Sequence, residues 1–281
     1  MKIKVMSDST CDLSKDLISK YNVEILPLTV IKGGIAYKDG VDITPADIFS
    51  HVAAGNDLCS TTATNVGEYT EVFAKYSQEY DGIIHISLGS GFSSSYQNAC
   101  IAADDFPNVR VIDSQNLSTG QGLVVLKACE LAAQCDDLDA IAKALTEYTT
   151  RIEASFILDQ LGYMVKGGRC SAVAALGANL LSLKPCIEVK NGKMSVVKKY
   201  RGNFSKCITA YIKDRLADRE DIDCGTLFVT HTPVSKDCMT SVQECIDAYS
   251  KFDTVYRTEA GCTVSCHCGP STLGVLFVRS K

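Results

Sequence analysis

The chain has 281 residues, of which 46% are hydrophobic and 22% charged, and its net charge is −5 at pH 7. These values are typical of a soluble protein with one large or two medium domains. An acidic balance argues against nucleic acid as a partner, because such binding depends on cationic contacts to phosphates. No run reaches the roughly 18 apolar residues of a membrane span, and no signal-peptide pattern is present. We therefore expect a cytoplasmic protein without stable membrane insertion.

Strand and helix patterns alternate along the first half of the chain. Thr44 and Pro45 are typical of the N-cap and first position of one of the helices. The expected strands are 3–6, 23–31, 82–87 and 109–113, and the expected helices are 12–21, one opening at 44–47, 66–80, 94–104, 118–134 and 138–152. Such alternation predicts a Rossmann-like parallel sheet, in which ligands bind beyond the carboxyl ends of the strands.

The second half has a different, α+β pattern with an antiparallel element. Asn191-Gly192 between two β-rich segments is a strong hairpin signal. The expected strands are 154–158, 185–189, 193–200, 225–231, 254–258 and 273–279, and the expected helices are 171–183, 204–219 and 235–250. We predict two closely packed domains, an α/β domain at 1–160 and an α+β domain at 161–281 with a mixed or antiparallel sheet.

A Gly/Ser-rich loop follows the strand that ends at Ser87 and leads into a helix. Ser93 stands where an N-cap belongs, and Gly89 and Gly91 permit tight turns. Backbone amides, hydroxyls and the helix dipole would meet there, which suits an anion or a carboxylate. An ordinary capping loop is the equal alternative.

Three further polar motifs have both a structural and a functional interpretation. Thr61 and Thr62 precede a helix and are either capping residues or hydroxyl donors to a bound oxygen. Arg169, after two glycines, is either solvated at a helix end or offers its planar fork to a carboxylate. His267, beside a Gly-Pro turn, is either structural or a hydrogen-bonding group.

Fourteen cysteines are scattered along the chain, many of them in apolar patterns. In a cytoplasmic chain of this size we expect reduced thiols rather than a disulfide framework. The cluster of Cys262, Cys266, His267 and Cys268 is a candidate metal or redox module, but it lacks the second pair of ligands that a zinc site needs. We predict no metal and no cofactor.

A serine-dependent acyl hydrolase or transferase using Ser93 and His267 is the enzymatic alternative. The nucleophile elbow of such enzymes has the form Gly-x-Ser-x-Gly. Neither Ser87 nor Ser93 has both glycines. The sequence therefore favours a non-catalytic function.

Taken in order, the motifs resemble those of the DegV family, which includes the fatty-acid-binding FakB proteins. Asp8-Ser9 and Asp12-Leu13 are similar to its N-terminal signature, and Thr61-Thr62 stands where the family usually has Thr-Ser. The segments that carry the rest of the resemblance, which spans the whole chain, are 90–99, 166–169 and 267–270.

The resemblance implies a carrier that holds a long-chain fatty acid in a buried tunnel between its domains. It further implies that a fatty acid kinase, similar to dihydroxyacetone kinases, phosphorylates the bound acid for phospholipid metabolism. Hydroxyls of Thr61, Thr62 and Ser93 would hold the carboxylate, with His267 beside it. Arg169 and Arg201 would lie near the site's mouth and contact the partner or a phosphate. The ligand-binding positions so implied are Thr61, Thr62, Ser93, Ser94, Arg169, His267 and Gly269.

This chain departs from the family pattern at Thr62, which replaces Ser, and at Ser94 and Ser271, which replace Gly. The apolar helix expected at 172–183 is either a wall of the tunnel or ordinary core. The lysines and Arg201 around the hairpin either meet an acidic partner or are solvated.

Overall fold

The computed structural model describes residues 1–176 and 183–280 of the chain. Thirteen strands and eleven α-helices lie within these residues, together with one short 3₁₀ helix. In chain order they are β1 (Ile3–Asp8), η1 (Ser9–Cys11), α1 (Lys15–Lys20), β2 (Glu24–Leu26), β3 (Thr29–Lys32), β4 (Ile35–Lys38), α2 (Pro45–Ala53), β5 (Ser60–Thr62), α3 (Val66–Ser77), β6 (Gly82–Ser87), α4 (Ser95–Ala103), β7 (Val109–Asp113), α5 (Ser118–Ala132), α6 (Leu138–Thr149), β8 (Ile152–Leu158), α7 (Leu161–Gly167), α8 (Ser171–Ala174), β9 (Leu183–Lys190), β10 (Lys193–Arg201), α9 (Phe204–Leu216), β11 (Ile222–His231), α10 (Lys236–Tyr249), β12 (Thr254–Glu259), α11 (Cys262–Cys268) and β13 (Thr272–Arg279).

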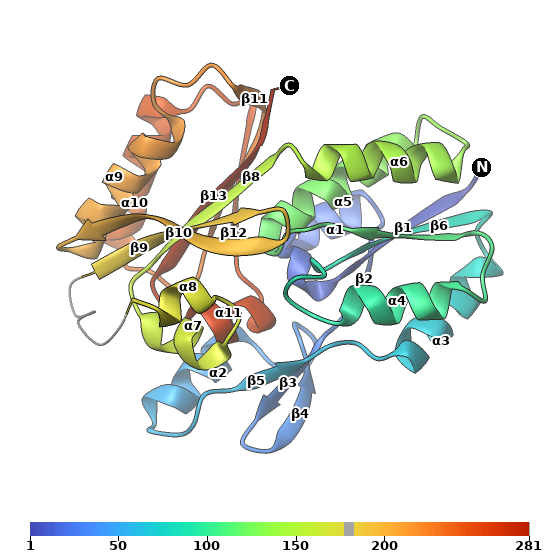
Figure 1. The fold of residues 1–281 in the computed structure, drawn as a ribbon, viewed down its shortest axis with the longest axis horizontal. Coiled ribbons are helices and arrows are strands. Elements are labelled where there is room, and N and C mark those ends of the chain that lie inside the picture. The colour runs from blue at the N-terminus through green and yellow to red at the C-terminus, as the bar shows by residue number, and fades with distance from the viewer. Residues whose placement is uncertain (177–182, 281) are drawn as a thin grey trace.

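The predicted parallel sheet is confirmed, with strand order β2-β1-β6-β7. Helices α3 and α4 cover one face, where Tyr69 and Phe73 are fully buried against Met6 and Ile83. Helix α5 covers the other face and also packs on the second sheet (Figure 1). The strand order reverses direction between β1 and β6, and parallel sheets bind ligands beyond such a switch point.

The second sheet is mixed, as expected, with order β10-β9-β8-β13-β11-β12. Its far face is covered by α9 and α10, which bury Ile208, Tyr211 and Val242 against it. The predicted hairpin joins β9 to β10 through Asn191 and Gly192, whose φ angles of +51° and +68° are those of a type I′ turn. This sheet begins at Ile152, and the division into domains near residue 160 stays a prediction.

A three-stranded sheet, β4-β3-β5, lies at the lower side of the molecule in Figure 1. Thr61 and Thr62 belong to its edge strand β5, where they pair with Val30 and Thr29 of β3. Of the two interpretations of these threonines, the one in which they cap the next helix is therefore wrong. Asn65 caps α3 instead, in a reciprocal arrangement with Glu68.

Several other predicted elements need correction. The apolar helix expected at 171–183 is wrong as a single element, because α8 ends at Ala174 and Leu183 begins β9. Half of the predicted tunnel wall, residues 177–182, lies outside the described residues. The helix expected at 12–21 begins only at Lys15 with Ser14 as its cap. Helices α7 and α11 are missing from the predicted elements, although one interpretation of Arg169 places it at a helix end, where the structure has it.

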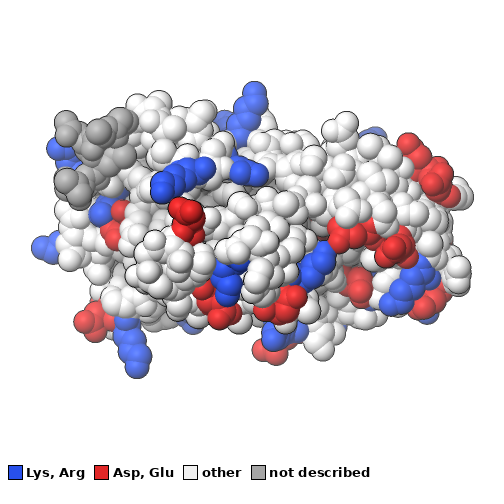
Figure 2. All heavy atoms as spheres, turned by 90° about the horizontal axis from the view of Figure 1, so that it is seen from below, with Lys and Arg blue, Asp and Glu red and all other residues white. Residues whose placement is uncertain are grey.

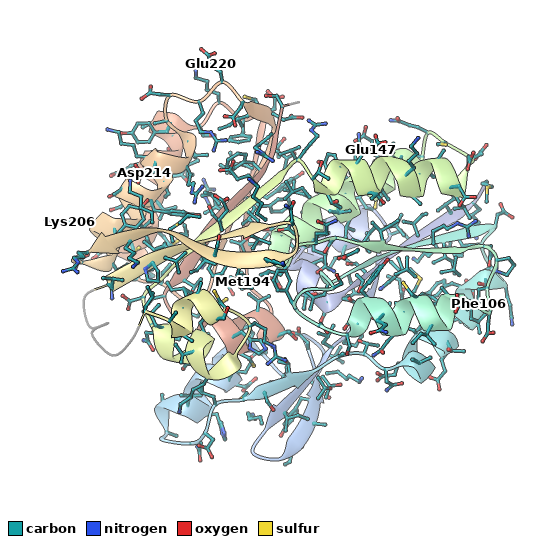
Figure 3. The ribbon with its side chains drawn as sticks, in the orientation of Figure 1. Phe106, Glu147, Met194, Lys206, Asp214 and Glu220 are labelled. Carbon is teal, nitrogen blue, oxygen red and sulfur yellow. The ribbon has the colours of Figure 1, made fainter. Side chains whose placement is uncertain are left out.

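Figure 2 shows the molecule from below the view of Figure 1. On this face Lys and Arg are interspersed with Asp and Glu. Side chains labelled at the periphery of Figure 3 include Lys206 and Glu220, whereas Met194, on strand β10 of the hairpin, lies near the centre. None of the helices in residues 1–176 and 183–280 has the length and apolar character needed to span a membrane.

Candidate functional site

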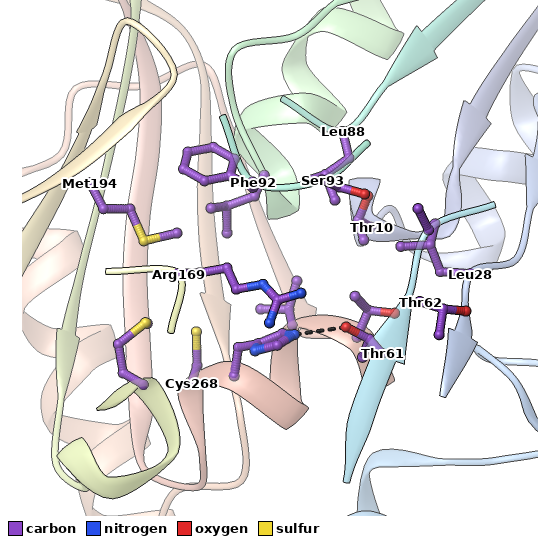
Figure 4. A pocket seen from close by; sticks show the side chains of 16 residues that line it. Thr10, Leu28, Thr61, Thr62, Leu88, Phe92, Ser93, Arg169, Met194 and Cys268 are labelled. Atoms are coloured by element: carbon purple, nitrogen blue, oxygen red, sulfur yellow. Dashed lines mark hydrogen bonds between the residues drawn. The ribbon is translucent and has the colours of Figure 1, made fainter. Parts of the chain in front are cut away.

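A cavity of about 560 Å³ of space free of protein atoms, part of it open to solvent, lies at the switch point between β1 and β6. Its walls come from the loops after these strands, from β5, α7 and α11, and from the tip of the β9–β10 hairpin (Figure 4). The polar lining residues include Thr10, Thr61, Thr62, Ser93, Arg169 and His267, and the apolar ones include Leu28, Leu88, Phe92, Leu117, Met164 and Met194.

Five of the residues predicted for the site therefore lie together in this cavity, although they come from four separate segments. They are Thr61, Thr62, Ser93, Arg169 and His267. The structure does not place the other three in its lining. Ser94 lies on a neighbouring surface hollow, and Gly269 packs against the ring of Tyr163. Arg201 is exposed at the end of β10.

Thr61 and His267 form the central contact of the site. Thr61 Oγ1 lies 2.8 Å from His267 Nε2, which connects β5 to α11. Neighbouring side chains on a strand point to opposite faces. Accordingly, Thr61 points toward His267 in Figure 4, whereas Thr62 points to the other side of the strand, near Leu28. Thr61 is therefore the better placed of the two hydroxyls.

His267 is uncharged in this environment. Burial, together with the nearby positive charge of Arg169, lowers the pKa of its imidazole to about 4. Its Nδ1 has no hydrogen-bond partner and faces Gly167, where a Cβ atom would lie only 2.6 Å from it. Gly167 is thus needed for close approach, and positive charge at the site comes from Arg169 rather than from His267.

Arg169 follows α7, which ends at Gly168 with φ +70°. Its Nη1 donates a hydrogen bond to Gly167 O at 2.7 Å. Within the described residues no carboxylate lies within ion-pair distance of this guanidinium. Its remaining donors therefore face the cavity and solvent, where they suit an anion that enters from outside.

Ser93 is not the N-cap of α4, contrary to the prediction. The helix begins at Ser95, so Ser94 takes the cap position, but its backbone angles (φ −77°, ψ 0°) are not the extended ones that aim a cap side chain at the first amides. Ser93 Oγ accepts a hydrogen bond from Ser95 N at 3.1 Å and lies 2.9 Å from Ser95 Oγ. Its hydroxyl thus sits at the helix start and lines the cavity.

The loop that carries Ser93 is held by a buried carboxylate at the end of β1. Asp8 Oδ2 accepts hydrogen bonds from Leu88 N at 2.8 Å and from Ser87 Oγ at 2.9 Å. Asp8 Oδ1 accepts one from the Tyr69 hydroxyl at 2.6 Å. The adjacent ends of β1 and β6 are thereby tied together, which sets where the loop starts.

A second cavity, of about 410 Å³, lies beside the first and is lined mainly by residues of β8, β11 and β13. Leu117, Val264 and Cys268 line both cavities. The exposed lining of the second cavity is almost entirely apolar. The hydroxyl of Thr230, one of its lining residues, lies 2.6 Å from that of Thr119, which is outside the lining. The two cavities together offer a polar end and an apolar end.

The side chains of the candidate metal or redox cluster at 262–268 do not point toward a common centre. Cys262 and Cys266 face an apolar cluster with Val30 and Ile48, whereas Cys268 lines the cavities. No group of three or more His, Cys, Asp or Glu side chains in the described part of the chain could hold a metal ion. All fourteen cysteines lie in that part, and each is a free thiol.

Two residues that line the cavity, Met194 and Phe92, are not among those predicted for the site. Met194 reaches the cavity from the hairpin, whose Gly192 lies against Gly91 so closely that a Cβ on Gly91 would be 2.0 Å from the Gly192 carbonyl oxygen. Phe92 belongs to the Gly/Ser-rich loop, in which only the polar residues and glycines predicted a binding site. Neither contact has a signal in local sequence, since each depends on how distant segments pack.

Comparison with known proteins shows the family to which the chain belongs. The model of a family described as uncharacterised proteins of the DegV family matches residues 2–280. A DegV domain-containing protein of Clostridium acetobutylicum is 35% identical over 99% of both chains. A DegV family protein of Thermus thermophilus, whose structure is described by its fatty acid binding, has a TM-score of 0.89 and 27% identity over 99% of this chain and 100% of its own.

A protein of Thermotoga maritima, described as revealing a fatty acid binding function, has a TM-score of 0.81 and 25% identity over 99% of both chains. The resemblance found in the motifs is thus confirmed over the whole length of the chain. This protein belongs to the DegV family.

Proposed function

We propose that this protein binds a long-chain fatty acid, with the carboxylate in the first cavity and the acyl chain directed toward the second. The observation that carries the proposal is the gathering of Thr61, Ser93, Arg169 and His267 at one end of two otherwise apolar cavities. The fatty acid binding described for the Thermus and Thermotoga proteins supports it.

The acyl chain and the polar groups contribute differently to the free energy of binding. Each buried methylene contributes roughly 0.8 kcal/mol, so a chain of about 14 contributes on the order of 11 kcal/mol before the costs of association. A hydrogen bond to a charged group contributes about 1.5–3 kcal/mol. We therefore infer that the tail determines most of the affinity, while the polar groups determine where the carboxylate points.

The ligand would lie between the two proposed domains, 1–160 and 161–281. Thr61 and Ser93 come from the first, and Arg169 and His267 come from the second. A carboxylate bound by all four would contact both domains at once.

We propose a carrier rather than a serine-dependent enzyme. Catalysis by Ser93 would need a base within hydrogen-bond reach of its hydroxyl. Ser93 Oγ contacts Ser95 instead, and His267 Nε2 is occupied by Thr61. Incubation with a chromogenic acyl ester should give no turnover, and turnover that is lost in Ser93→Ala would contradict the carrier function.

The partner that we propose is a fatty acid kinase of the dihydroxyacetone-kinase-like type, which would transfer a phosphoryl group from ATP to the carboxylate oxygen. Arg169 and Arg201 are both exposed. Arg169 follows the end of α7, and Arg201 is the last residue of β10. With such a kinase present, Arg201→Ala should lower acyl-phosphate formation and leave the content of fatty acid unchanged. Equal loss of both would contradict this role.

Binding itself is tested by titrating the full-length protein with a fluorescent polyene fatty acid and displacing it with unlabelled acids. We expect saturable binding that long-chain acids displace and short-chain acids do not. The proposal would be overturned if none of the long-chain acids displaced the probe.

A further inference from the structure

Helix α11 begins against two buried carboxylates that lie far away in the sequence. Asp39 Oδ1 accepts a hydrogen bond from Cys262 N at 2.8 Å, and Asp39 Oδ2 accepts one from Thr263 N at 3.1 Å. Asp12 Oδ1 accepts one from Gly261 N at 2.8 Å. The side chains of Asp12 and Asp39 are only 6% and 4% exposed. The unpaired amides at the start of this helix are therefore bound by side chains and not by water.

Each carboxylate is also held from a second direction. Asp39 Oδ2 accepts a hydrogen bond from Ser9 Oγ at 3.0 Å, and Ser9 Oγ in turn accepts one from Leu28 N at 3.1 Å. Asp12 Oδ2 accepts one from Ser118 Oγ at 2.6 Å. Hydrogen bonds from Ser9 and Ser118 thus tie the two carboxylates to the half of the molecule that contains the parallel sheet.

Gly261 shows how close this contact is. Its φ of −65° is open to any residue, so glycine is not required there for backbone conformation. A Cβ on Gly261 would lie 2.9 Å from Asp12 Oδ1. The glycine is needed because a side chain would displace the carboxylate.

The same short helix contributes four residues to the lining of the first cavity, namely Thr263, Val264, His267 and Cys268. A helix of seven residues has little stability of its own, so its position depends on what holds its two ends. The C-terminal end is held by the contact of His267 with Thr61. The N-terminal end is held by Asp39 and Asp12.

We propose that Asp39, assisted by Asp12, is a positioning residue of the fatty-acid site, which fixes the start of α11 and thereby places His267 against Thr61. The inference rests on the proposed function for its ligand. The placement of His267 can be measured without any ligand.

The two carboxylates differ in a way that makes the proposal testable. Both oxygens of Asp39 accept from backbone N–H groups, which cannot reverse their role. The NH₂ group of Asp39→Asn would therefore oppose one of those amides. Asp12 has one backbone donor and one hydroxyl, Ser118, and a hydroxyl can accept as well as donate. Asp12→Asn can keep both contacts, so the same substitution should have unequal effects.

The experiment uses full-length Asp39→Asn and Asp12→Asn, with Asp214→Asn as control, because Asp214 bonds Lys198 and Tyr200 on the far side of the second sheet. The His267 ring is titrated by NMR without ligand, and affinity is measured with a fluorescent fatty acid. In Asp39→Asn we expect the pKa of His267 to rise from about 4 toward 6.5, since the ring becomes solvated, and affinity to fall about tenfold. Asp12→Asn and Asp214→Asn should change either readout little.

A folded Asp39→Asn protein with an unchanged His267 titration would overturn the proposal, whatever its affinity. Equal effects of the two substitutions would overturn it too. If the wild-type protein binds no fatty acid, the proposed function fails while the His267 titration still decides the positioning role. If Asp39→Asn does not fold, Gly261→Ala is used in its place. An unchanged pKa of His267 in Gly261→Ala would then contradict the proposal.

Discussion

His267 Nε2 lies 2.8 Å from Thr61 Oγ1, although 206 positions separate the two residues in the chain. This contact joins the edge strand β5 to helix α11 at the point where the first cavity is most polar. Because His267 is uncharged and Arg169 has no carboxylate partner among the described residues, the site has one free cation and several hydroxyls. That combination suits a single carboxylate.

Thr61 and Thr62 provide a matched pair for testing the contact. Thr61→Val removes the partner of His267 and one donor to the carboxylate, so fatty acid affinity should fall roughly tenfold, the effect of about 1.5 kcal/mol. Thr62→Val, whose side chain points to the other side of β5, should change affinity less than threefold, within about 0.6 kcal/mol. Displacement of a fluorescent fatty acid measures both, and equal losses would contradict the placement of the two hydroxyls.

Gly91 tests the closure of the cavity by the hairpin. A Cβ at this position would lie 2.0 Å from the Gly192 carbonyl oxygen, so Gly91→Ala should push the hairpin tip and Met194 away from the site. We expect faster release of a fluorescent fatty acid in stopped-flow measurements and a loss of stability of about 1–3 kcal/mol.

The control for this substitution is Gly162→Ala, since no atom lies within 4 Å of a Cβ at Gly162. An unchanged release rate in Gly91→Ala would show that the hairpin tip does not restrain the ligand.

Val264 tests whether the acyl chain passes from the first cavity to the second. It lines both, and Phe at this position would fill space between them. Val264→Phe should shift the co-purified acids toward shorter chains without abolishing carboxylate binding. Val264→Ala should not shorten them. Mass spectrometry of the bound lipid measures the distribution, and an unchanged chain length in Val264→Phe would place the tail elsewhere.

Asp12 predicts a pH dependence of stability. Burial raises the pKa of its carboxyl to about 7, and the neighbouring Asp39 contributes to the rise. Between the ordinary value of 3.8 and about 7, the folded chain holds a proton that the unfolded chain has released. The free energy of unfolding therefore falls as pH rises through this range, by up to roughly 4 kcal/mol.

Asp12→Asn removes this effect. The difference in free energy of unfolding, variant minus wild type, should rise across the same range in a series of urea denaturations, while the contributions of other groups cancel. A difference that does not change with pH would contradict the raised pKa of Asp12.

The sequence predicted the features that depend on neighbouring residues. Asn191 and Gly192 formed the expected hairpin because both tolerate positive φ, and Thr44 caps α2 because its hydroxyl accepts from Asp47 N three residues on. The alternation of strands and helices was sufficient to predict the parallel sheet.

What could not be predicted depends on contacts between distant segments. Helix α11 is short and rich in residues of modest helix propensity, and its start is stabilised by carboxylates of Asp12 and Asp39. Thr61 lies in a strand because β3 offers an open edge, which local pattern does not reveal. The sequence therefore predicted several residues of the site, but not the strand β5 and the helix α11 that hold two of them.

The most direct test of the account is lipid extraction and mass spectrometry of the full-length protein, purified from bacteria without added ligand. We predict about one long-chain fatty acid per protein molecule, retained through purification. A protein that carries no fatty acid, and takes up none when titrated with long-chain acids, would contradict the proposal that this chain binds fatty acids.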